Sequence, residues 1–380
     1  MTDSLRLAMV AGEASGDLLA GLLMRGLKRR WPDLHAAGIG GPRMAEQGFE
    51  AWWPHSKLSV HGYIEALKHI REILGIRNQL AKRLLSDPPQ VFIGVDAPDF
   101  NLGLEARLKA AGVRTVHFVS PSIWAWRAER IFKIAQSVDH MLCLFPFEPA
   151  IYARQGIPAT YVGHPLADAI PLEPPRAAAR AALGLLPDAQ VVALLPGSRK
   201  AEVEYIAPAL ARAAALLRRE RPGLAFILPA VPGLRTRIDA ILAREAPDAG
   251  IRVFDGRSHE ALAACDVTLI ASGTATLEAA LFKRPMVITY AMSALSWQLM
   301  KRKRLQAWVG LPNILCEDFV VPELLQHDAT PRALAQATLA WLDDPARSAV
   351  LSARFLQLHE QLRCDTATRA TDAIAKVLQA

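Results

Sequence analysis

The chain has 380 residues, which is too long for one ordinary hydrophobic core and fits two α/β domains. Hydrophobic residues make up 52% of it and charged residues 21%, so we expect a globular protein and exclude a disordered one. The net charge of +7 suggests anionic partners, and phosphorylated substrates or an anionic membrane surface fit better than nucleic acid, because aromatic residues are not interleaved with the basic ones.

Short apolar runs alternate with helical patterns through the first half of the chain. The runs cover 5–10, 36–39, 91–95, 115–119 and 140–144, and each ends at a turn rich in small, acidic or proline residues. Continuously apolar strands separated by helices are typical of a parallel sheet that is covered on both faces. We therefore predict a Rossmann-like N-terminal domain over residues 1–168.

Two aspartates follow the run at 91–95 directly. Asp96 and Asp99 stand on either side of Pro98, which restricts the turn. A carboxylate at a strand end can take a proton from a hydroxyl nucleophile, whereas a turn aspartate commonly accepts hydrogen bonds from nearby backbone amides. We assign the catalytic role to Asp96 and the turn role to Asp99, and the reverse assignment stays open.

The segment 63–84 is predicted to be a basic amphipathic helix. An apolar stripe on one face is flanked by basic residues: Ile64, Leu67, Ile70 and Leu74 form the stripe, and Lys68, Arg71, Arg77, Lys82 and Arg83 lie beside it. Such a helix can lie in a bilayer interface, but by its pattern alone the stripe is more typical of one that faces the protein core. The basic run 301–304 also has two interpretations, a membrane-facing patch or a solvated helix end. Because no apolar stretch could span a bilayer and no export signal opens the chain, we expect a cytoplasmic protein.

A proline-rich stretch at 165–175 interrupts the first pattern and is predicted to link two domains. Apolar runs then recur at 191–195, 225–228, 251–254, 267–271 and 286–290. These runs predict a second Rossmann-like domain over 169–345. Ligands of such sheets bind beyond the carboxyl ends of the strands, so we expect the two domains to face one deep cleft.

Two turns of the second domain are suited to phosphate. In Pro196-Gly197-Ser198-Arg199 the guanidinium of Arg199 matches phosphate oxygens. The turn Ser272-Gly273-Thr274-Ala275 opens a helix whose first N–H groups form an anion site, and Glu278, about one turn later, can accept hydrogen bonds from ribose hydroxyls. The alternative for this second turn is a capped helix with an acidic first turn, which needs no ligand.

Several other chemistries lack their motifs. The chain has no D-x-D triplet, no H-E-x-x-H, no full G-x-G-x-x-G loop and no Walker loop, so we expect no metal and no ATP or NAD cofactor. Its four cysteines lie far apart, which argues against a disulfide framework or a zinc site. A leaving diphosphate would then be held by protein cations and helix N-termini, in agreement with the role given to Arg199.

Seven motifs in this order and spacing resemble the lipid-A-disaccharide synthases of bacterial lipopolysaccharide assembly, across essentially the whole chain. They are Ala11-Gly12-Glu13-Ala14-Ser15-Gly16-Asp17, Gly40-Gly41-Pro42-Arg43-Met44, Asp96-Ala97-Pro98-Asp99-Phe100-Asn101, Ser120-Pro121-Ser122-Ile123-Trp124-Ala125-Trp126-Arg127, Leu195-Pro196-Gly197-Ser198-Arg199, Ser272-Gly273-Thr274-Ala275-Thr276-Leu277-Glu278 and Leu311-Pro312-Asn313. The resemblance implies the two-domain glycosyltransferase-B fold. It also implies an inverting transfer of 2,3-diacylglucosamine from UDP to the 6-hydroxyl of 2,3-diacylglucosamine 1-phosphate, giving the β-1,6 disaccharide 1-phosphate and UDP.

In that reaction the resemblance implies Asp96 as the base, Arg199 with Gly197 and Ser198 and the turn 272–275 on the diphosphate, and Glu278 on ribose. It adds Glu13, Ser15 and Asn313 as residues that line the cleft. It implies work at the inner face of the cytoplasmic membrane of a Gram-negative bacterium, with residues 63–84 as the contact. His61 departs from the apolar residue common in the family.

The resemblance further implies a homodimer and places the C-terminal helices, 346–380, on the N-terminal domain, in some members exchanged between subunits. The alternatives are another UDP-sugar enzyme of the same fold, such as a UDP-N-acetylglucosamine 2-epimerase or the lipid-linked transferase of peptidoglycan synthesis, and a non-catalytic sugar-nucleotide binding protein.

Overall fold

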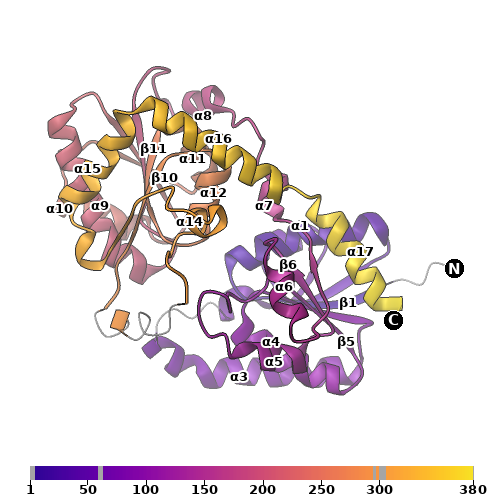
Figure 1. Ribbon diagram of the computed structural model, residues 1–380. Helices are drawn as coiled ribbons and strands as arrows, with labels where there is room; N and C mark the ends of the chain where they lie inside the picture. The colour runs from indigo at the N-terminus through magenta and orange to yellow at the C-terminus, as the bar shows by residue number, and fades with distance from the viewer. Residues whose placement is uncertain (1–4, 59–62, 294–296, 299–304, 380) are drawn as a thin grey trace. The chain divides into compact units, whose positions relative to one another are not determined.

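The computed structural model describes residues 5–58, 63–293, 297–298 and 305–379, without the side chains of 63–69. The chain forms two compact units (Figure 1): Met1–Ala169 together with Gln361–Ala380, and Ile170–Glu360. The sequence-based interpretations of His61, of the run 301–304 and of the side chains of Ile64 and Leu67 lie outside the described residues.

The first unit contains a seven-stranded parallel sheet with the strand order β3-β2-β1-β4-β5-β6-β7. The strands are β1 (Arg6–Ala11), β2 (His35–Gly40), β3 (Glu50–Pro54), β4 (Val91–Val95), β5 (Arg114–Phe118), β6 (His140–Cys143) and β7 (Ala159–Tyr161). The helices are α1 (Ala14–Arg30), α2 (Pro42–Ala45), α3 (Tyr63–Ser86), α4 (Pro98–Ala110), α5 (Arg130–Ser137), α6 (Glu148–Ala153), α7 (Pro165–Ala169) and α17 (Thr366–Gln379), with a 3-10 turn at His55–Lys57. The central strands are buried, as their continuous apolar runs predict.

The second unit contains a six-stranded parallel sheet with the strand order β10-β9-β8-β11-β12-β13. The strands are β8 (Val191–Leu195), β9 (Ala225–Ala230), β10 (Ile251–Asp255), β11 (Val267–Ala271), β12 (Met286–Tyr290) and β13 (Glu323–Leu325). The helices are α8 (Arg176–Ala182), α9 (Lys200–Glu220), α10 (Arg235–Glu245), α11 (Ser258–Ala264), α12 (Thr274–Leu281), α14 (Leu311–Cys316), α15 (Pro331–Leu342) and α16 (Pro345–Leu362), with a 3-10 turn at Gln326–Asp328.

Two parallel-sheet units confirm the predicted fold class, but three edge strands were not predicted. Strands β3, β7 and β13 each lie at an edge of their sheet. Their residues are mostly half-buried or exposed, so they lack the continuous apolar run that identifies the central strands.

The C-terminal segment returns to the first unit later than the sequence suggested. Residues 345–360 of α16 belong to the second unit, and only Gln361–Ala380 belongs to the first. There α17 packs on α1 so closely that a Cβ added to Gly26 would lie 2.6 Å from the carbonyl oxygen of Ala367. The carboxylate of Asp168 accepts the amides of Asp365 at 3.0 Å and Thr366 at 2.7 Å, which fixes the start of α17.

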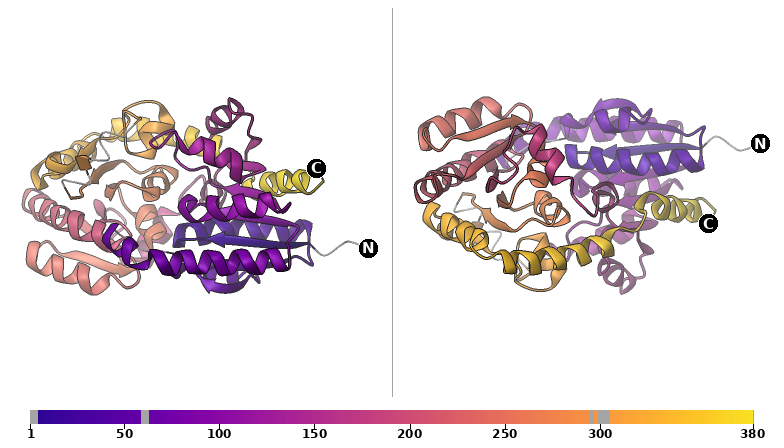
Figure 2. Two further views of the ribbon diagram at one scale, coloured as in Figure 1. Left: turned by 90° about the horizontal axis from the view of Figure 1, so that it is seen from below. Right: turned by 90° about the horizontal axis from the view of Figure 1, so that it is seen from above.

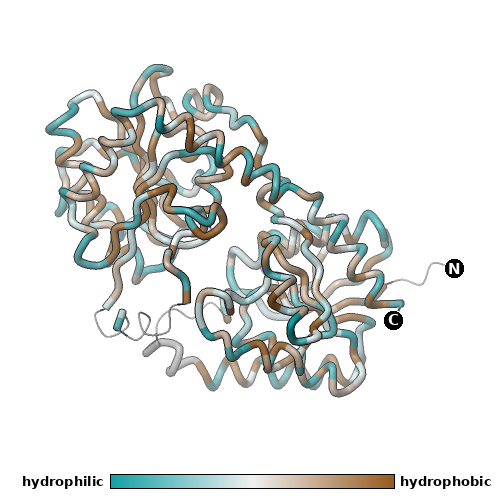
Figure 3. The backbone as a smooth tube through the Cα atoms, viewed as in Figure 1, coloured by the Kyte–Doolittle hydropathy of each residue, from teal (hydrophilic) through white to brown (hydrophobic). Residues whose placement is uncertain are grey.

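Helix α3 runs beside the strands of the first sheet (Figure 2), and from residue 70 onward apolar and polar residues alternate along it (Figure 3). Its core-facing residues include Ile76, Leu80 and Leu84, which belong to one hydrophobic cluster with residues of β1, β4 and α4. Ile70 and Leu74 are instead 47% and 38% exposed. The interpretation that the predicted stripe faces the core is therefore wrong for these two residues. In the described part of the chain, every helix is too short or too polar to cross a membrane.

Candidate active site

Each sheet has one point at which the strand order reverses direction, and the predicted site residues follow the strands that meet there. In the first sheet this point lies between β1 and β4, where Ala11 is paired with Val95. In the second sheet it lies between β8 and β11, where Leu195 is paired with Ile270. Open α/β sheets bind their ligands at such switch points. With the exception of Asn313, the predicted residues thus lie at or just beyond the carboxyl ends of the central strands of each unit.

Asp96 follows β4 in an uncommon backbone conformation. Asp96 and Ala97 have φ angles of 50° and 43°, in the left-handed region that non-glycine residues rarely adopt. The amide of Asp96 donates to the carbonyl of Phe118 at 2.9 Å, and its own carbonyl accepts Nδ2 of Asn101 at 2.8 Å. Such conformations cost on the order of 1–3 kcal/mol each and cluster at functional sites. The chain therefore holds Asp96 at the strand end at the expense of local strain.

Gly12 makes the switch point narrow. A Cβ added to Gly12 would lie 2.7 Å from the Cβ of Ala97, so only glycine lets the turns after β1 and β4 approach this closely. The next residue, Glu13, is half-buried and caps the start of α1, where its carbonyl accepts the amide of Asp17 at 2.9 Å. Ser15 is half-buried in the first turn of α1. The structure thus brings Glu13 and Ser15 to the strand end next to that of Asp96.

Asp99 has a different environment from Asp96. Its Oδ1 contacts the guanidinium of Arg130, and Nη1 of Arg127 lies 3.8 Å from the same oxygen. Both arginines come from the segment between β5 and the first turn of α5. Asp99 is thus engaged with two cations, which differs from the turn role, bonded to backbone amides, that the sequence suggested for it.

Asp17, for which the sequence predicted no role, holds the turn after β2 in the structure. Its side chain is 2% exposed and accepts three backbone amides: Gly41 at 2.8 Å, Arg43 at 2.9 Å and Met44 at 3.1 Å. A Cβ on Gly41 would lie 2.1 Å from the ring of His55, so this turn needs glycine. The only sequence signal was an acidic residue near the start of a helix, which is common.

The turn after β8 is organised by Glu202. Its Oε2 accepts the amides of Ser198 at 3.0 Å and Arg199 at 3.2 Å, and a Cβ on Gly197 would lie 2.6 Å from it. These two amides are therefore already occupied, and the expected backbone phosphate site at this turn is taken by a carboxylate. The side chain of Arg199 is 46% exposed, with Nη1 3.7 Å from Glu202 Oε1. Its guanidinium is the group of this turn that can meet a phosphate.

The turn after β11 is open at the start of α12. Nothing lies within 4 Å of a Cβ added to Gly273, and both Gly273 and Thr274 are exposed. The hydroxyl of Ser272 points elsewhere and donates to the carbonyl of Val309 at 3.2 Å. Ala275 is half-buried in the first turn of the helix. The open approach suits an anion at the helix start.

Glu278 is paired with a histidine that sequence reasoning missed. Its Oε2 lies 3.3 Å from Nε2 of His259, and the carboxylate is 17% exposed. The ring of His259 packs on Phe282, with centroids 5.3 Å apart. Since the two residues lie on neighbouring helices, α11 and α12, nothing in the local sequence of either reveals the other.

Asn313 is fully buried, although it was expected to line the site. Its Nδ2 donates to Val321 O and to Glu323 Oε1, both at 2.9 Å, and its Oδ1 accepts the amide of Val321 at 2.9 Å. Glu323 also accepts the amide of Val309 at 3.0 Å. Through Glu323, Asn313 therefore supports the backbone at Val309, whose carbonyl accepts the hydrogen bond of Ser272. Asn313 does not face a ligand site here.

A buried carboxylic acid lies near the end of β6. Glu148 is 1% exposed and accepts the amide of Phe145 at 3.0 Å and the indole N–H of Trp124 at 3.1 Å. Burial raises the pKa of Glu148 to about 7. The ring of His164 stacks on Phe145 with centroids 6.1 Å apart, and burial lowers the pKa of His164 to about 3. Both residues were outside the predicted site.

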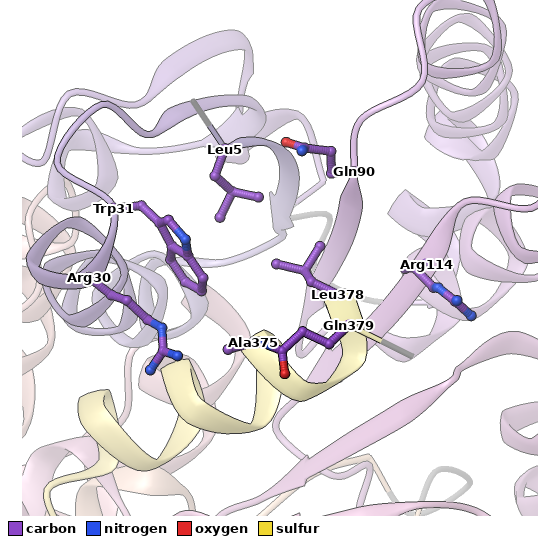
Figure 4. Close-up of a pocket in the computed structure, with 8 residues that line it drawn as sticks. All are labelled: Leu5, Arg30, Trp31, Gln90, Arg114, Ala375, Leu378 and Gln379. Carbon is purple, nitrogen blue, oxygen red and sulfur yellow. The ribbon is translucent and has the colours of Figure 1, made fainter. Parts of the chain in front are cut away.

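A pocket of about 660 Å³ opens at the amino ends of the strands of the first sheet (Figure 4). It is lined by Leu5, Arg30, Trp31, Gln90, Arg114, Ala375, Leu378 and Gln379. Leu5, Gln90 and Arg114 stand at the starts of β1, β4 and β5, so this pocket lies at the amino ends of the strands. It is therefore separate from the candidate active site.

Comparison with known proteins gives one consistent family. Residues 7–374 match the family model of lipid-A-disaccharide synthetase. The lipid-A-disaccharide synthase of Albidiferax ferrireducens is 61% identical over 384 residues, covering 100% of this chain and 99% of that protein.

Two solved structures are similar in fold. The UDP-GlcNAc 2-epimerase from Neisseria meningitidis has a TM-score of 0.67 at 10% identity, covering 99% of this chain and 100% of that one. The calicheamicin glycosyltransferase CalG4 has a TM-score of 0.62 at 14% identity, covering 100% of this chain and 99% of that one. At these identities the two structures establish the glycosyltransferase-B fold alone.

Proposed function

Because the chain belongs to the lipid-A-disaccharide synthetase family, and is therefore a UDP-sugar glycosyltransferase of lipid A biosynthesis, we propose that Asp96 is the base of its transfer reaction. The donor is the UDP ester of 2,3-diacylglucosamine and the acceptor is 2,3-diacylglucosamine 1-phosphate. The observation that carries the assignment of the base is the left-handed backbone of Asp96 at the end of β4, where this strand meets β1 at the switch point of the first sheet.

Inverting transfer needs one base and one stabiliser of the leaving group. Asp96 takes the proton of the acceptor 6-hydroxyl as its oxygen attacks the anomeric carbon of the donor. The bond from that carbon to the diphosphate oxygen breaks, and its electron pair leaves with UDP. The new bond forms on the opposite face, so the α-linked donor yields the β-1,6 product.

The leaving diphosphate is held by the second unit. The guanidinium of Arg199 and the amides at the start of α12 supply positive charge where negative charge develops. Glu278, oriented by His259, accepts hydrogen bonds from the ribose. We propose that these groups replace a divalent cation, so that the enzyme needs no metal and no other cofactor.

The protein acts on lipids, and we propose that it works at the cytoplasmic face of the inner membrane. The exposed Ile70 and Leu74 on α3, beside the exposed Arg71, support a contact of this helix with an anionic bilayer surface. We also keep the homodimer as a proposal that rests on the family resemblance.

Product analysis tests the function directly. Purified enzyme is given UDP-diacylglucosamine and diacylglucosamine 1-phosphate, and the products are identified by mass spectrometry and by the anomeric coupling in NMR spectra. We expect one tetra-acylated β-1,6 disaccharide 1-phosphate per UDP released. Epimerised donor without disaccharide would indicate the epimerase alternative, and bound donor without any turnover would indicate a binding protein.

A further inference from the structure

The segment from the end of β5 to α5 contains residues with strained backbone conformations. It follows the carboxyl end of β5, next to the strand end that carries Asp96. Nine non-glycine residues of the described chain have positive φ, and four of them are Asp96, Ala97, Val119 and Arg127. Val119 has a φ of 80°, which is a severe outlier for a β-branched residue, and Arg127 has a φ of 55°. Backbone strain concentrates where a structure holds side chains for a function. The left-handed backbone of Arg127 therefore points to a function for its side chain.

Arg127 and Arg130 converge on one carboxylate oxygen. Arg130 contacts Oδ1 of Asp99, and Nη1 of Arg127 lies 3.8 Å from the same atom. The indole of Trp126 lies against both guanidinium groups, whose central carbons are 4.2 Å and 5.6 Å from its ring centroid. The aromatic ring thus stabilises two neighbouring cations on one side.

The charges in this cluster do not balance. Two guanidinium groups are paired with the single negative charge of Asp99. Both of them approach the same oxygen of its carboxylate, Oδ1. The arginine side chains are only 28% and 14% exposed, whereas Asp99 is 81% exposed. An ion pair to so exposed a carboxylate contributes little to stability. The cluster is better suited to a doubly charged ligand with three oxygens, which two forked guanidinium groups can bind together.

We propose that Arg127 and Arg130 bind the phosphate monoester of the acceptor, and that Asp99 is the exchangeable partner that holds them until the phosphate arrives. This inference rests on the proposed function, because it names the group that recognises one of its substrates. It places the acceptor phosphate at the two arginines that contact Asp99, and Asp99 follows Asp96 by three residues along the chain. In the pyranose ring C1 and C5 flank the ring oxygen and C5 carries the 6-hydroxymethyl group, so the 1-phosphate and the 6-hydroxyl lie close enough for one end of the sheet to hold both.

The decisive experiment compares two acceptors, diacylglucosamine with and without its 1-phosphate, in Arg127→Gln, Arg130→Gln and the double variant. We expect KM for the phosphorylated acceptor to rise about 10- to 100-fold per arginine, from the loss of charged hydrogen bonds, while KM for the dephosphorylated acceptor and for the donor stays unchanged. Arg130→Lys keeps the charge without the fork and should lose less. An equal change in KM for both acceptors would overturn the proposal.

Asp99→Asn and Arg30→Gln serve as matched variants. Removing the exchangeable partner in Asp99→Asn should lower KM for the phosphorylated acceptor and preserve kcat; a loss of kcat would show that Asp99 is catalytic and overturn its assigned role. Arg30 pairs with Asp372 at 2.6 Å in the same unit, near the pocket at the amino ends of the strands. Arg30→Gln should leave both acceptor KM values unchanged.

A binding measurement keeps the test independent of turnover. Titration with inorganic phosphate, followed by calorimetry in the presence of saturating UDP to fill the proposed diphosphate site of the second unit, should show one site in the wild type that is lost in the double variant and retained in Arg30→Gln. Flotation with phosphatidylglycerol vesicles tests whether the arginines bind the phosphate of a membrane lipid instead. If the double variant loses vesicle binding but keeps its preference for the phosphorylated acceptor, the arginines bind a lipid headgroup and the proposal is wrong.

The failure of the proposed function would look different. If the wild type binds phosphate at these residues but makes no disaccharide, the proposed function fails and the phosphate site stands.

Discussion

The Nζ atom of Lys283 lies 2.6 Å from Nδ1 of His359 in the interior of the second unit. Lys283 is 8% exposed, and its ammonium also reaches the carbonyl of Pro171 at 3.4 Å. Pro171 is the second residue of this unit, and His359 is the last but one. One buried lysine therefore bonds to both segments by which the chain enters and leaves the unit.

Lys283→Met should destabilise the second unit, because the buried imidazole of His359 loses its charged donor. We expect a decrease of about 1–3 kcal/mol in the free energy of unfolding, measured by urea denaturation. Lys200→Met, at an exposed lysine in the same unit, serves as the control and should change it by less than about 0.5 kcal/mol. Equal effects of the two substitutions would show that the bond to His359 contributes nothing.

Asp96→Asn should abolish transfer and preserve UDP binding. Removing a general base typically lowers kcat by about 10²- to 10⁴-fold, and the amide keeps the shape of the side chain. Steady-state kinetics give kcat, calorimetry gives UDP affinity, and circular dichroism checks the fold. A variant with nearly normal turnover would rule out Asp96 as the base.

Arg199→Gln should lower kcat by about 10²- to 10³-fold, since it removes a cation from the leaving diphosphate. Arg235→Gln is the matched control, because the side chain of Arg235 is 40% exposed in this unit and pairs with Asp239. In the wild type, transfer should continue in excess EDTA. Strict dependence on a divalent cation would contradict the charge-holding role of Arg199.

Serine at Ile70 and Leu74 should release the protein from membranes. Both side chains are exposed, so their removal costs the core little, while the loss of apolar area weakens insertion into the bilayer interface. Flotation with phosphatidylglycerol vesicles measures the effect. Leu186 and Val350 are 74% and 73% exposed in the other unit, and serine at these two positions is the matched control. If both double variants float like the wild type, α3 is not the contact.

Glu148 and His164 should give opposite pH dependences of stability. The raised pKa of Glu148, about 7, means that the folded state binds its proton more tightly than the unfolded state, so stability falls as pH rises from about 4.5 to 7. The lowered pKa of His164, about 3, means that the folded state keeps it neutral, so stability rises with pH up to about 6.5. Between about pH 4.5 and 6.5 the two effects oppose each other.

Single substitutions should separate these effects. Glu148→Gln leaves His164 unopposed, and its free energy of unfolding relative to the wild type should rise by about 1–2 kcal/mol from pH 5 to 6.5. His164→Asn should change in the opposite direction over the same range. The free energy of unfolding of each variant is measured by urea denaturation and compared with that of the wild type at the same pH. The contributions of the other titrating groups cancel in this difference. Parallel curves for all three proteins would refute the pKa assignments.

The sequence alone was enough to predict the two sheets and the turns that carry chemistry. Runs such as 91–95 and 267–271 are fully buried strands, and Asp96 and Ser272 directly follow them. Continuous hydrophobicity is a local property, so it can be read without knowing the neighbours of a strand. The edge strands β3, β7 and β13 escaped prediction because they are partly exposed and lack a continuous apolar run, whereas the run 251–254 did predict the edge strand β10.

Only the tertiary structure decided which partner each site residue has. Asp99 meets Arg130, Glu278 meets His259, and Asp17 holds the turn at Gly41. These pairs join residues 19 to 31 positions apart, and they form because neighbouring strands and helices bring them together. Hydropathy patterns predict that a segment is buried but not what it is packed against. The sequence by itself therefore determined the fold class and the turns that carry the site, and the order of strands in each sheet determined which charges meet there.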